Sequence, residues 1–268
     1  NDRLTAINSD GFTLGDDGNP NNGSNTYVCW QWKANGGTTS TNSDGTVDVT
    51  IQVNSTAGFS IMKWNGNGNT SGTVGHGLGA KPDFIVEKYG LDGTSNWGVA
   101  FPALETSKLL TLNSTSGFAT ASGLSGYNTT VWTDGNGAAT GGTIAYAFKN
   151  IQGYSKFGKY TGTGNSDGPF VYTGFKPAWL MIKRKEGSGY WVMLDSKRNT
   201  PNGTGKRLGA QATDAEYGSA NVDIVSNGFK VRASNSDSDT NLNGDDYVFM
   251  AFAEHPFVSS EGIPVTAR

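Results

Sequence analysis

Five oxygen-bearing side chains alternate along one loop near the end of the chain. They are Asp237, Asp239, Asn241, Asn243 and Asp245. Carboxylate and amide oxygens in this alternation are the usual ligands of Ca²⁺. The bidentate glutamate of a calcium loop is absent, because the twelfth position counted from Asp239 is Met250. The pattern therefore predicts a polar hairpin tip, with a bound Ca²⁺ as the alternative.

Aromatic and polar side chains gather in neighbouring loops. An aromatic ring stacks on the C–H groups of a sugar, while amides, carboxylates and guanidinium groups bond its hydroxyls. Tyrosines lie here among Gly, Ser and Asn, and loop 195–206 adds donors and acceptors. The alternative for each tyrosine is that it covers the end of the core with its hydroxyl in water. The predicted ligand set is Tyr190, Asp195, Arg198, Asn202 and Tyr217.

The residues that catalysis would need are few. His76 and His255 are the only histidines and lie in unrelated places, so neither a zinc site nor a Ser-His-Asp triad is indicated. Paired carboxylates cleave glycosides, and one region carries several, whose counterparts elsewhere are mostly uncharged. They are Asp195, Asp214, Glu216 and Asp223. We predict that the protein is not an enzyme, and a glycan depolymerase is the least favoured alternative.

Charge and composition argue against several partners. A net charge of −3 and a pI near 5.4 do not supply the clustered positive field that nucleic acid requires. The basic run Lys183-Arg184-Lys185 is interpreted as a solvated strand end. No apolar run approaches the roughly 20 residues that cross a bilayer, so membrane insertion is not expected. Gly66-x-Gly68-x-x-x-Gly72 lacks dinucleotide spacing, and we expect no cofactor apart from the Ca²⁺ considered above.

Two diverged copies of one unit account for most of the chain. Lys63-Trp64-Asn65-Gly66 matches Lys159-Tyr160-Thr161-Gly162, and Lys81-Pro82 matches Lys176-Pro177, each pair followed by an apolar run. A spacing of about 95 residues marks a repeat architecture. We predict a first unit at 57–150, a second unit at 151–257 and a C-terminal tail at 258–268. Residues 1–33 are expected to be the C-terminal part of an upstream unit, followed by a linker or edge strand at 34–56.

Each unit is predicted to close with a strand that has two different faces. These strands lie at residues 27–32, 143–148 and 247–252, and alternate residues place large apolar side chains on one face in all three. The second face is smaller and mixed, and we expect it to meet solvent or a neighbouring element. Cys29, the only cysteine, aligns with Ala145 and Phe249 on that second face. It is therefore predicted to be a packing residue.

The fold class follows from these strands and from the turns between them. Glycine makes up 39 of the 268 residues, which is typical of tight turns that join short strands, and long helical periodicity is absent. We predict an all-β protein of tandem antiparallel β-sandwich units with jelly-roll or lectin-like topology. Residues 1–33 should pack on the unit that follows, because Trp30 and Trp32 would otherwise form an exposed apolar patch.

Five glycine-rich or aromatic stretches are distinctive. They are Ala57-Gly58-Phe59-Ser60-Ile61, Thr73-Val74-Gly75-His76-Gly77-Leu78-Gly79, Gly153-Tyr154-Ser155-Lys156-Phe157-Gly158, Gly168-Pro169-Phe170-Val171-Tyr172-Thr173-Gly174-Phe175 and Met250-Ala251-Phe252-Ala253-Glu254. Together they resemble a repeat domain of unassigned function found in tail-fibre-like virion proteins of marine and cyanobacterial tailed phages. The resemblance covers essentially the whole chain.

The resemblance implies a place and a role. The place is the virion, in a tail fibre or surface appendage that acts outside the cell, and the implied partners are a host cell-surface glycan and other virion tail or fibre proteins. Fibres of this kind are commonly homotrimers. The expected function is bacteriophage adhesion to the host through carbohydrate binding, and the alternative is a structural spacer or decoration module. A concave pocket lined by Tyr190 and Tyr217 would favour adhesion, whereas flat loops with buried aromatics would favour the spacer.

Overall fold

The described part of the chain is built from strands without helices. The computed structural model describes residues 2–66, 71–91, 93–120, 123–135, 141–198, 206–218 and 221–253, and the backbone of 257–258 and 264–265. Within these ranges every strand ladder is antiparallel, and none of the described segments forms a helix. The all-β prediction is confirmed. A search of the same residues finds no helix with the length and hydropathy to cross a membrane.

A large sheet and a small sheet form the first unit. In spatial order, the eight strands of the large sheet are β10 (Ala119–Thr120), β9 (Lys108–Thr111), β8 (Trp97–Ala100), β7 (Phe84–Tyr89), β13 (Thr143–Phe148), β5 (Phe59–Trp64), β4 (Val49–Asn54) and β3 (Ser40–Asn42). The small sheet contains β11 (Leu124–Ser125), β12 (Val131–Asp134) and β6 (Gly72–Gly75). The alternating run near residues 47–53 does form a strand, β4, and the edge of the sheet is β3.

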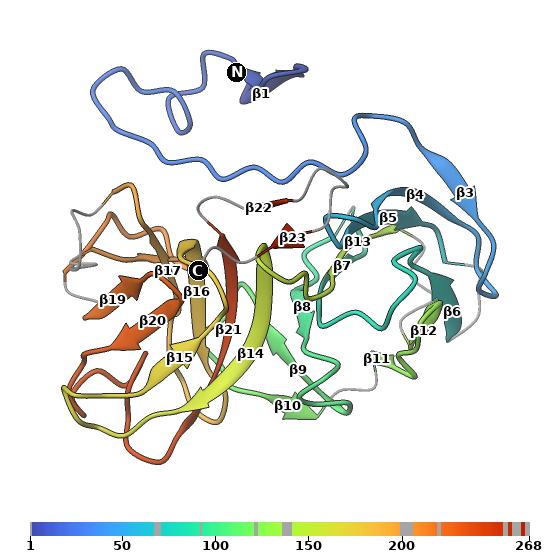
Figure 1. The fold of residues 1–268 in the computed structure, drawn as a ribbon. Helices are drawn as coiled ribbons and strands as arrows, with labels where there is room; N and C mark the ends of the chain where they lie inside the picture. Colours follow the sequence, from blue (N-terminus) through green and yellow to red (C-terminus); the bar gives the residue numbers. More distant parts are fainter. Residues whose placement is uncertain are drawn as a thin grey trace.

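The second unit repeats this topology. Its large sheet has the order β14 (Ser155–Thr161), β21 (Asp246–Ala253), β16 (Pro177–Arg184), β17 (Trp191–Asp195) and β18 (Leu208–Gly209), and its small sheet contains β15 (Phe170–Tyr172), β20 (Gly228–Val231) and β19 (Val222–Val225). The order β14-β21-β16-β17-β18 corresponds to β5-β13-β7-β8-β9, and β15-β20-β19 corresponds to β6-β12-β11. Figure 1 shows the two units side by side, the second in yellow to red.

Each unit has an apolar core between its own two sheets. In the first unit Met62, Ala145 and Trp132 are among the side chains that meet in this core. In the second unit Phe249 and Ala251 of β21 pack with Phe229 of β20. The second face of the closing strands β13 and β21 is therefore buried inside its own unit, against a neighbouring element rather than solvent.

A third core joins the two large sheets. The first face of the closing strands contributes Phe148 from β13 and Met250 and Phe252 from β21, and these side chains pack with Phe84 and Phe157. Phe148 and Phe252 lie with ring centroids 5.8 Å apart. We call this set the shared core. The closing strands are thus buried on both faces, which explains why both of their alternating residue sets contain apolar side chains.

The loop at 112–118 also connects the units. Lys183 Nζ and the backbone N–H of Gly189 both donate hydrogen bonds to the Thr115 carbonyl at 2.9 Å. Lys183 is fully buried, and burial lowers its pKa to about 8 against the opposing attraction of Asp239. The prediction that Lys183 belongs to a solvated strand end is therefore wrong, because a loop of the other unit covers it.

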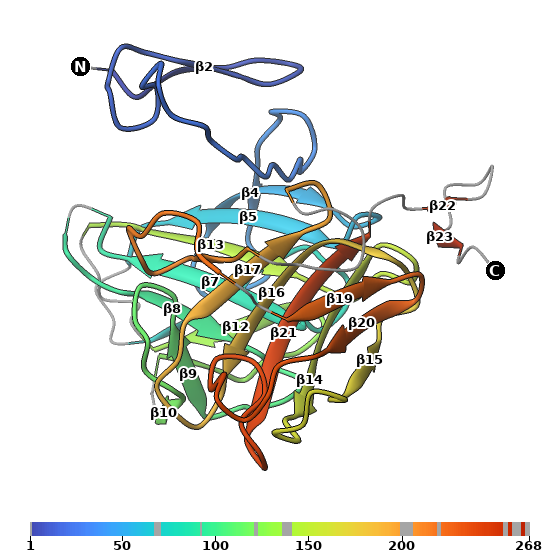
Figure 2. The same cartoon turned by 90° about the vertical axis from the view of Figure 1, so that its left-hand side faces the viewer.

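The N-terminal residues form a hairpin and, at residues 27–33, an extended segment that we call the strap. Strands β1 (Leu4–Ile7) and β2 (Phe12–Leu14) pair only with each other, and both views show this hairpin standing apart from the two units (Figure 2). Residues 27–32, predicted to form a closing strand, form none. Cys29 is exposed, so its prediction as a packing residue is wrong.

The strap nevertheless packs on the body of the protein through its tryptophans. The ring centroids of Trp30 and Trp32 lie 6.2 Å and 5.3 Å from that of Trp179, and Trp32 lies 5.2 Å from Phe252. These contacts are on the second unit, not on the first unit that follows in sequence. Where the predicted second unit meets the predicted tail, β22 (Phe257–Val258) pairs with β23 (Pro264–Val265) of the tail.

Candidate functional site

Three loops of the second unit meet at Arg207. Its backbone forms an antiparallel bridge with Tyr217, and its Nη1 lies 3.2 Å from Asp237 Oδ1 and 3.4 Å from Asp239 Oδ2. The guanidinium carbon lies 4.9 Å from the centroid of the Tyr217 ring. Asp239 in turn accepts the backbone N–H of Tyr190 at 2.9 Å. The two tyrosines and two of the acidic residues therefore belong to one cluster, which we call the tyrosine–arginine cluster.

The two predicted tyrosines contact each other. Their ring centroids are 5.9 Å apart in an edge-to-face arrangement, and both side chains are half-buried. The Tyr190 hydroxyl donates to Asp214 Oδ2 at 3.4 Å. Burial raises the pKa of Tyr217 although Arg207 opposes the shift, so this hydroxyl remains protonated at neutral pH. The two rings thus form an apolar surface, and their hydroxyl groups are the hydrogen-bonding groups of the pair.

Three polar atoms of this cluster lack a hydrogen-bond partner among the described residues. They are Arg207 Nε, Gln211 Nε2 and the Tyr217 hydroxyl, all shielded from solvent. The Gln211 side chain is held in place because its Oε1 accepts the backbone N–H of Trp191 at 2.9 Å. Buried donors without partners are costly and uncommon in folded proteins. Their concentration beside two aromatic rings is what a polar, ring-shaped ligand would use.

Two of the remaining predicted ligands, Asp195 and Arg198, serve the fold. Asp195 is buried, and its Oδ1 accepts the backbone N–H groups of Lys197 and Arg198, each at 2.9 Å. Arg198 bonds Asp195 Oδ2 at 2.5 Å and Glu216 Oε1 at 3.0 Å, and its guanidinium carbon lies 5.6 Å from the Trp30 ring centroid. This arginine therefore ties a loop to the strap. Asn202 lies outside the described residues.

The predicted calcium ligands are divided between different partners. Asp237 and Asp239 face Arg207, and Asp245 is paired with Arg184. The Asn241 amide donates to Asn165 O at 2.8 Å and accepts the Thr163 N–H at 2.9 Å. The backbone N–H of Asn243 donates to Asn235 Oδ1 at 2.8 Å. A search of the described residues finds no group of three or more His, Cys, Asp or Glu side chains that could hold a metal ion.

His76 has a structural environment. It is fully buried, its ring stacks on Trp132 at 5.8 Å, and its Nδ1 accepts the backbone N–H of Leu78 at 3.2 Å. Burial lowers its pKa from the ordinary histidine value. These contacts hold a neutral imidazole in place. His255 lies outside the described residues.

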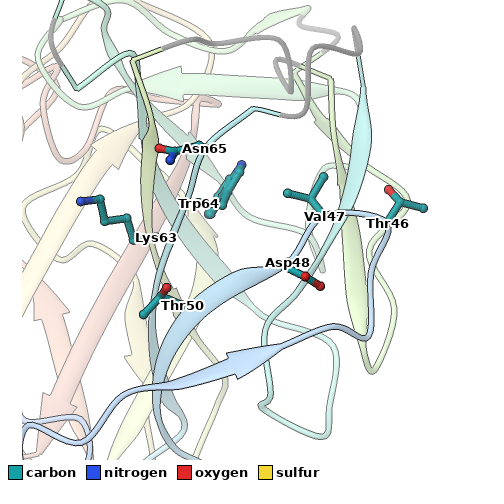
Figure 3. Close-up of a pocket in the computed structure, with 7 residues that line it drawn as sticks. All are labelled: Thr46, Val47, Asp48, Thr50, Lys63, Trp64 and Asn65. Carbon is teal, nitrogen blue, oxygen red and sulfur yellow. The ribbon is translucent and has the colours of Figure 1, made fainter.

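A groove of about 540 Å³ lies on the first unit, away from the tyrosines. Figure 3 shows its lining: Thr46, Val47, Asp48, Thr50, Lys63, Trp64 and Asn65. Trp64 is buried and its Nε1 donates to Asp134 Oδ2 at 3.3 Å, so its ring does not offer an open face. The tyrosine–arginine cluster therefore has the better chemistry for recognising a ligand.

Arg207 was not among the residues singled out from the sequence. The tyrosines stood out because they lie in turns rich in Gly, Ser and Asn. No sequence spacing connects Arg207 with an acidic loop that begins 30 positions later, since their contact depends on the pairing of β16, β17 and β21. Basic residues beside a strand, such as Lys206 and Arg207, are also common on protein surfaces.

Comparison with known proteins places the chain in a family. No curated protein and no solved structure gives a significant match. A family model described as Domain of unknown function (DUF7483) matches residues 1–256. The match spans the N-terminal hairpin, the strap and both units, so the chain belongs to the DUF7483 family.

Proposed function

We propose that the protein is an adhesion segment of a phage tail fibre or similar virion appendage, and that the tyrosine–arginine cluster binds a host-surface glycan. The observation that carries this proposal is the half-buried tyrosine pair beside three polar atoms without partners among the described residues. The sequence resemblance to tail-fibre-like virion proteins supports the setting. A site of this kind acts outside the cell, on the virion.

The chemistry of the cluster suits binding of a sugar. A tyrosine face packs on the C–H groups of a pyranose, and buried donors gain the hydrogen bonds that they lack. Arg207 and Gln211 would donate to sugar hydroxyls after ligand binding moves the side chains that shield them, and the exposed Asp214 would accept from those hydroxyls. The carboxylates nearby already serve ion pairs, as Asp195 and Glu216 do with Arg198. Glycan cleavage therefore stays the less favoured alternative, and we propose a binding protein without enzymatic activity.

Substitution at Tyr217 tests the site. The protein, presented as an oligomer, is screened on an array of bacterial surface polysaccharides and then titrated against the ligand that binds best. We expect Tyr217→Ala to weaken binding at least tenfold, because stacking and one hydrogen bond are lost together, about 1.4 kcal/mol or more. Tyr172→Ala is the matched control, since Tyr172 is an exposed tyrosine of the same unit on the other sheet. Equal losses from both substitutions would place the site elsewhere.

A structural spacer or decoration module is the second candidate. The observation in its favour is the shared core, which joins the two units into one body, together with the internal use of Asp195 and Arg198. A spacer needs rigidity and solubility but no ligand. Absence of binding by the oligomeric wild-type protein, both on the array and to whole bacterial cells, would favour this function.

Calcium is tested by removing it. Arg207 already pairs with both Asp237 and Asp239, so we expect the melting temperature to be the same with EDTA as with millimolar Ca²⁺. A bound metal would stabilise the folded state in proportion to its occupancy. A melting temperature several degrees lower in EDTA would show that these oxygens hold a metal after all.

The finer fold class belongs to the same proposal. We infer that each unit is a β-sandwich of the jelly-roll or lectin-like kind, because a large and a small antiparallel sheet enclose one apolar core in each. Such sandwiches commonly carry ligand sites on the loops that join their strands. The position of the tyrosine–arginine cluster on three such loops fits this class.

A further inference from the structure

Hairpin β1-β2 corresponds to a hairpin of the small sheets. In β1-β2, Leu4 pairs with Leu14 and Ile7 pairs with Phe12. In β19-β20 of the second unit, Val222 pairs with Val231 and Ile224 pairs with Phe229. The match Gly11-Phe12-Thr13-Leu14 to Gly228-Phe229-Lys230-Val231 aligns these pairs. The same four apolar positions therefore recur in both hairpins.

The apolar side chains of β1 have no covering sheet. Leu4 is 54% exposed and Ile7 is 83% exposed, whereas their equivalents Val222 and Ile224 are 0% and 8% exposed. In the second unit this hairpin face packs on the large sheet, through contacts of Phe229 with Phe249 at 5.2 Å. The N-terminal hairpin thus presents the inner face of a small sheet without its large sheet.

The strap likewise lacks the neighbouring strands of a large sheet. Residues 27–32 align with β13 and β21, each of which lies between two strands of its large sheet. Within the described part of the chain, no backbone N–H of residues 27–32 donates a hydrogen bond. Tyr27 is 51% exposed and Cys29 is exposed, whereas the equivalent Tyr247 and Phe249 fill an inner core.

We propose that residues 2–33 are an acceptor for the other half of a third unit, a chain segment that supplies strands equivalent to β14 through β18. That segment would pair with both edges of residues 27–32 and add a strand to the free edge of β2. Its large sheet would cover Leu4 and Ile7, and Tyr27 and Cys29 would enter the new inner core. Unpaired strand edges and uncovered apolar faces both favour such completion.

The contacts already present agree with this arrangement. In the closing strands of both units, one face enters the inner core and the other enters the shared core. In the strap, Trp30 and Trp32 already pack against the shared core, and it is the opposite face, with Tyr27 and Cys29, that is uncovered. The side of residues 2–33 that lacks a partner is therefore the side that faces the inner core in the other two units. The proposal is independent of the glycan site.

A fusion tests the acceptor. Residues 151–225 of this chain, which carry β14 through β19, are joined ahead of residue 2, and a second version that ends at residue 218 leaves β19 out. Cys29 is the only thiol of the parent chain and of both fusions, so its labelling rate reports burial of the strap directly. We expect labelling to slow about 100-fold in the version ending at residue 218, and the amides of 27–32 to gain protection from hydrogen exchange.

Two comparisons make the outcome decisive. In the fusion that ends at residue 218, Leu4→Asp combined with Ile7→Asp should restore fast labelling of Cys29, because a charged hairpin cannot cover the new core. The same double substitution in the parent chain should leave labelling unchanged. Labelling and amide exchange as fast in the fusion as in the parent chain would overturn the proposal.

Discussion

Glu87 is a buried carboxyl whose surroundings favour its neutral form. It lies on the inner face of β7, where its Oε2 has no hydrogen-bond partner among the described residues. Burial, and then the nearby charge of Asp134, raise its pKa well above the ordinary value of 4.5. The strand pairing places Ile182 at the equivalent position of the second unit. An apolar side chain therefore fits this position in the repeat.

The raised pKa makes stability depend on pH. Below the unfolded pKa both states hold the proton, and above it the unfolded chain releases a proton that the folded state retains. The contribution of Glu87 to the free energy of unfolding therefore falls as pH rises toward the folded pKa, by up to about 1.4 kcal/mol per pH unit. We expect Glu87→Gln to remove this loss, so that its advantage in unfolding free energy grows from pH 4.5 upward.

Urea unfolding at several pH values measures this difference. The matched control is Glu105→Gln, a substitution of a glutamate with a partly exposed side chain that pairs with Lys108 at 4.0 Å in the same unit. Parallel pH profiles for wild type and Glu87→Gln would contradict the expected role of Glu87. Tyr127, which is half-buried in the same core, has its pKa raised above the range of this experiment.

At the scale of elements, strands with a paired neighbour were predictable and the strap was not. Alternation placed the closing strands at 143–148 and 247–252, and the structure has β13 and β21 there. The same pattern at residues 27–32 produces no strand, because a strand requires hydrogen-bonding neighbours that the pattern itself cannot supply. Lys183 shows the same limit, since its burial depends on a loop from the other unit.

The strap is held by its tryptophans, and this can be measured. Trp32 contacts Trp179 and Phe252 at centroid distances of 5.3 Å and 5.2 Å. We expect Trp32→Ala to lower the free energy of unfolding by about 1–3 kcal/mol, since the side chain is only half-buried. It should also increase proteolytic cleavage near residues 27–34. Tyr27→Ala, at an exposed position of the same strap, should change neither quantity, and equal effects would argue against anchoring by Trp32.

At the scale of the whole molecule, the repeat was visible in the sequence but the contact between its copies was not. Matched lysines, glycines and apolar runs indicated two units, and their sheets do share one strand order. Which faces meet was not determined by this pattern, because an apolar face fits either an inner core or a neighbouring unit. The shared core resolves the question, since it buries the outer faces of both large sheets.

The shared core should make the two units unfold together. Phe148 stacks on Phe59 at 4.4 Å and also contacts Phe157 at 5.9 Å and Phe252 at 5.8 Å, so it touches both units. We expect Phe148→Ala to cost about 3–5 kcal/mol and to lower one common melting transition. Phe229→Ala lies wholly within the second unit and provides the comparison. If the two units unfold together, Phe229→Ala should also weaken amide protection in β12 of the first unit. Two melting transitions, of which Phe229→Ala shifts only one, would mean that the shared core joins independently stable units.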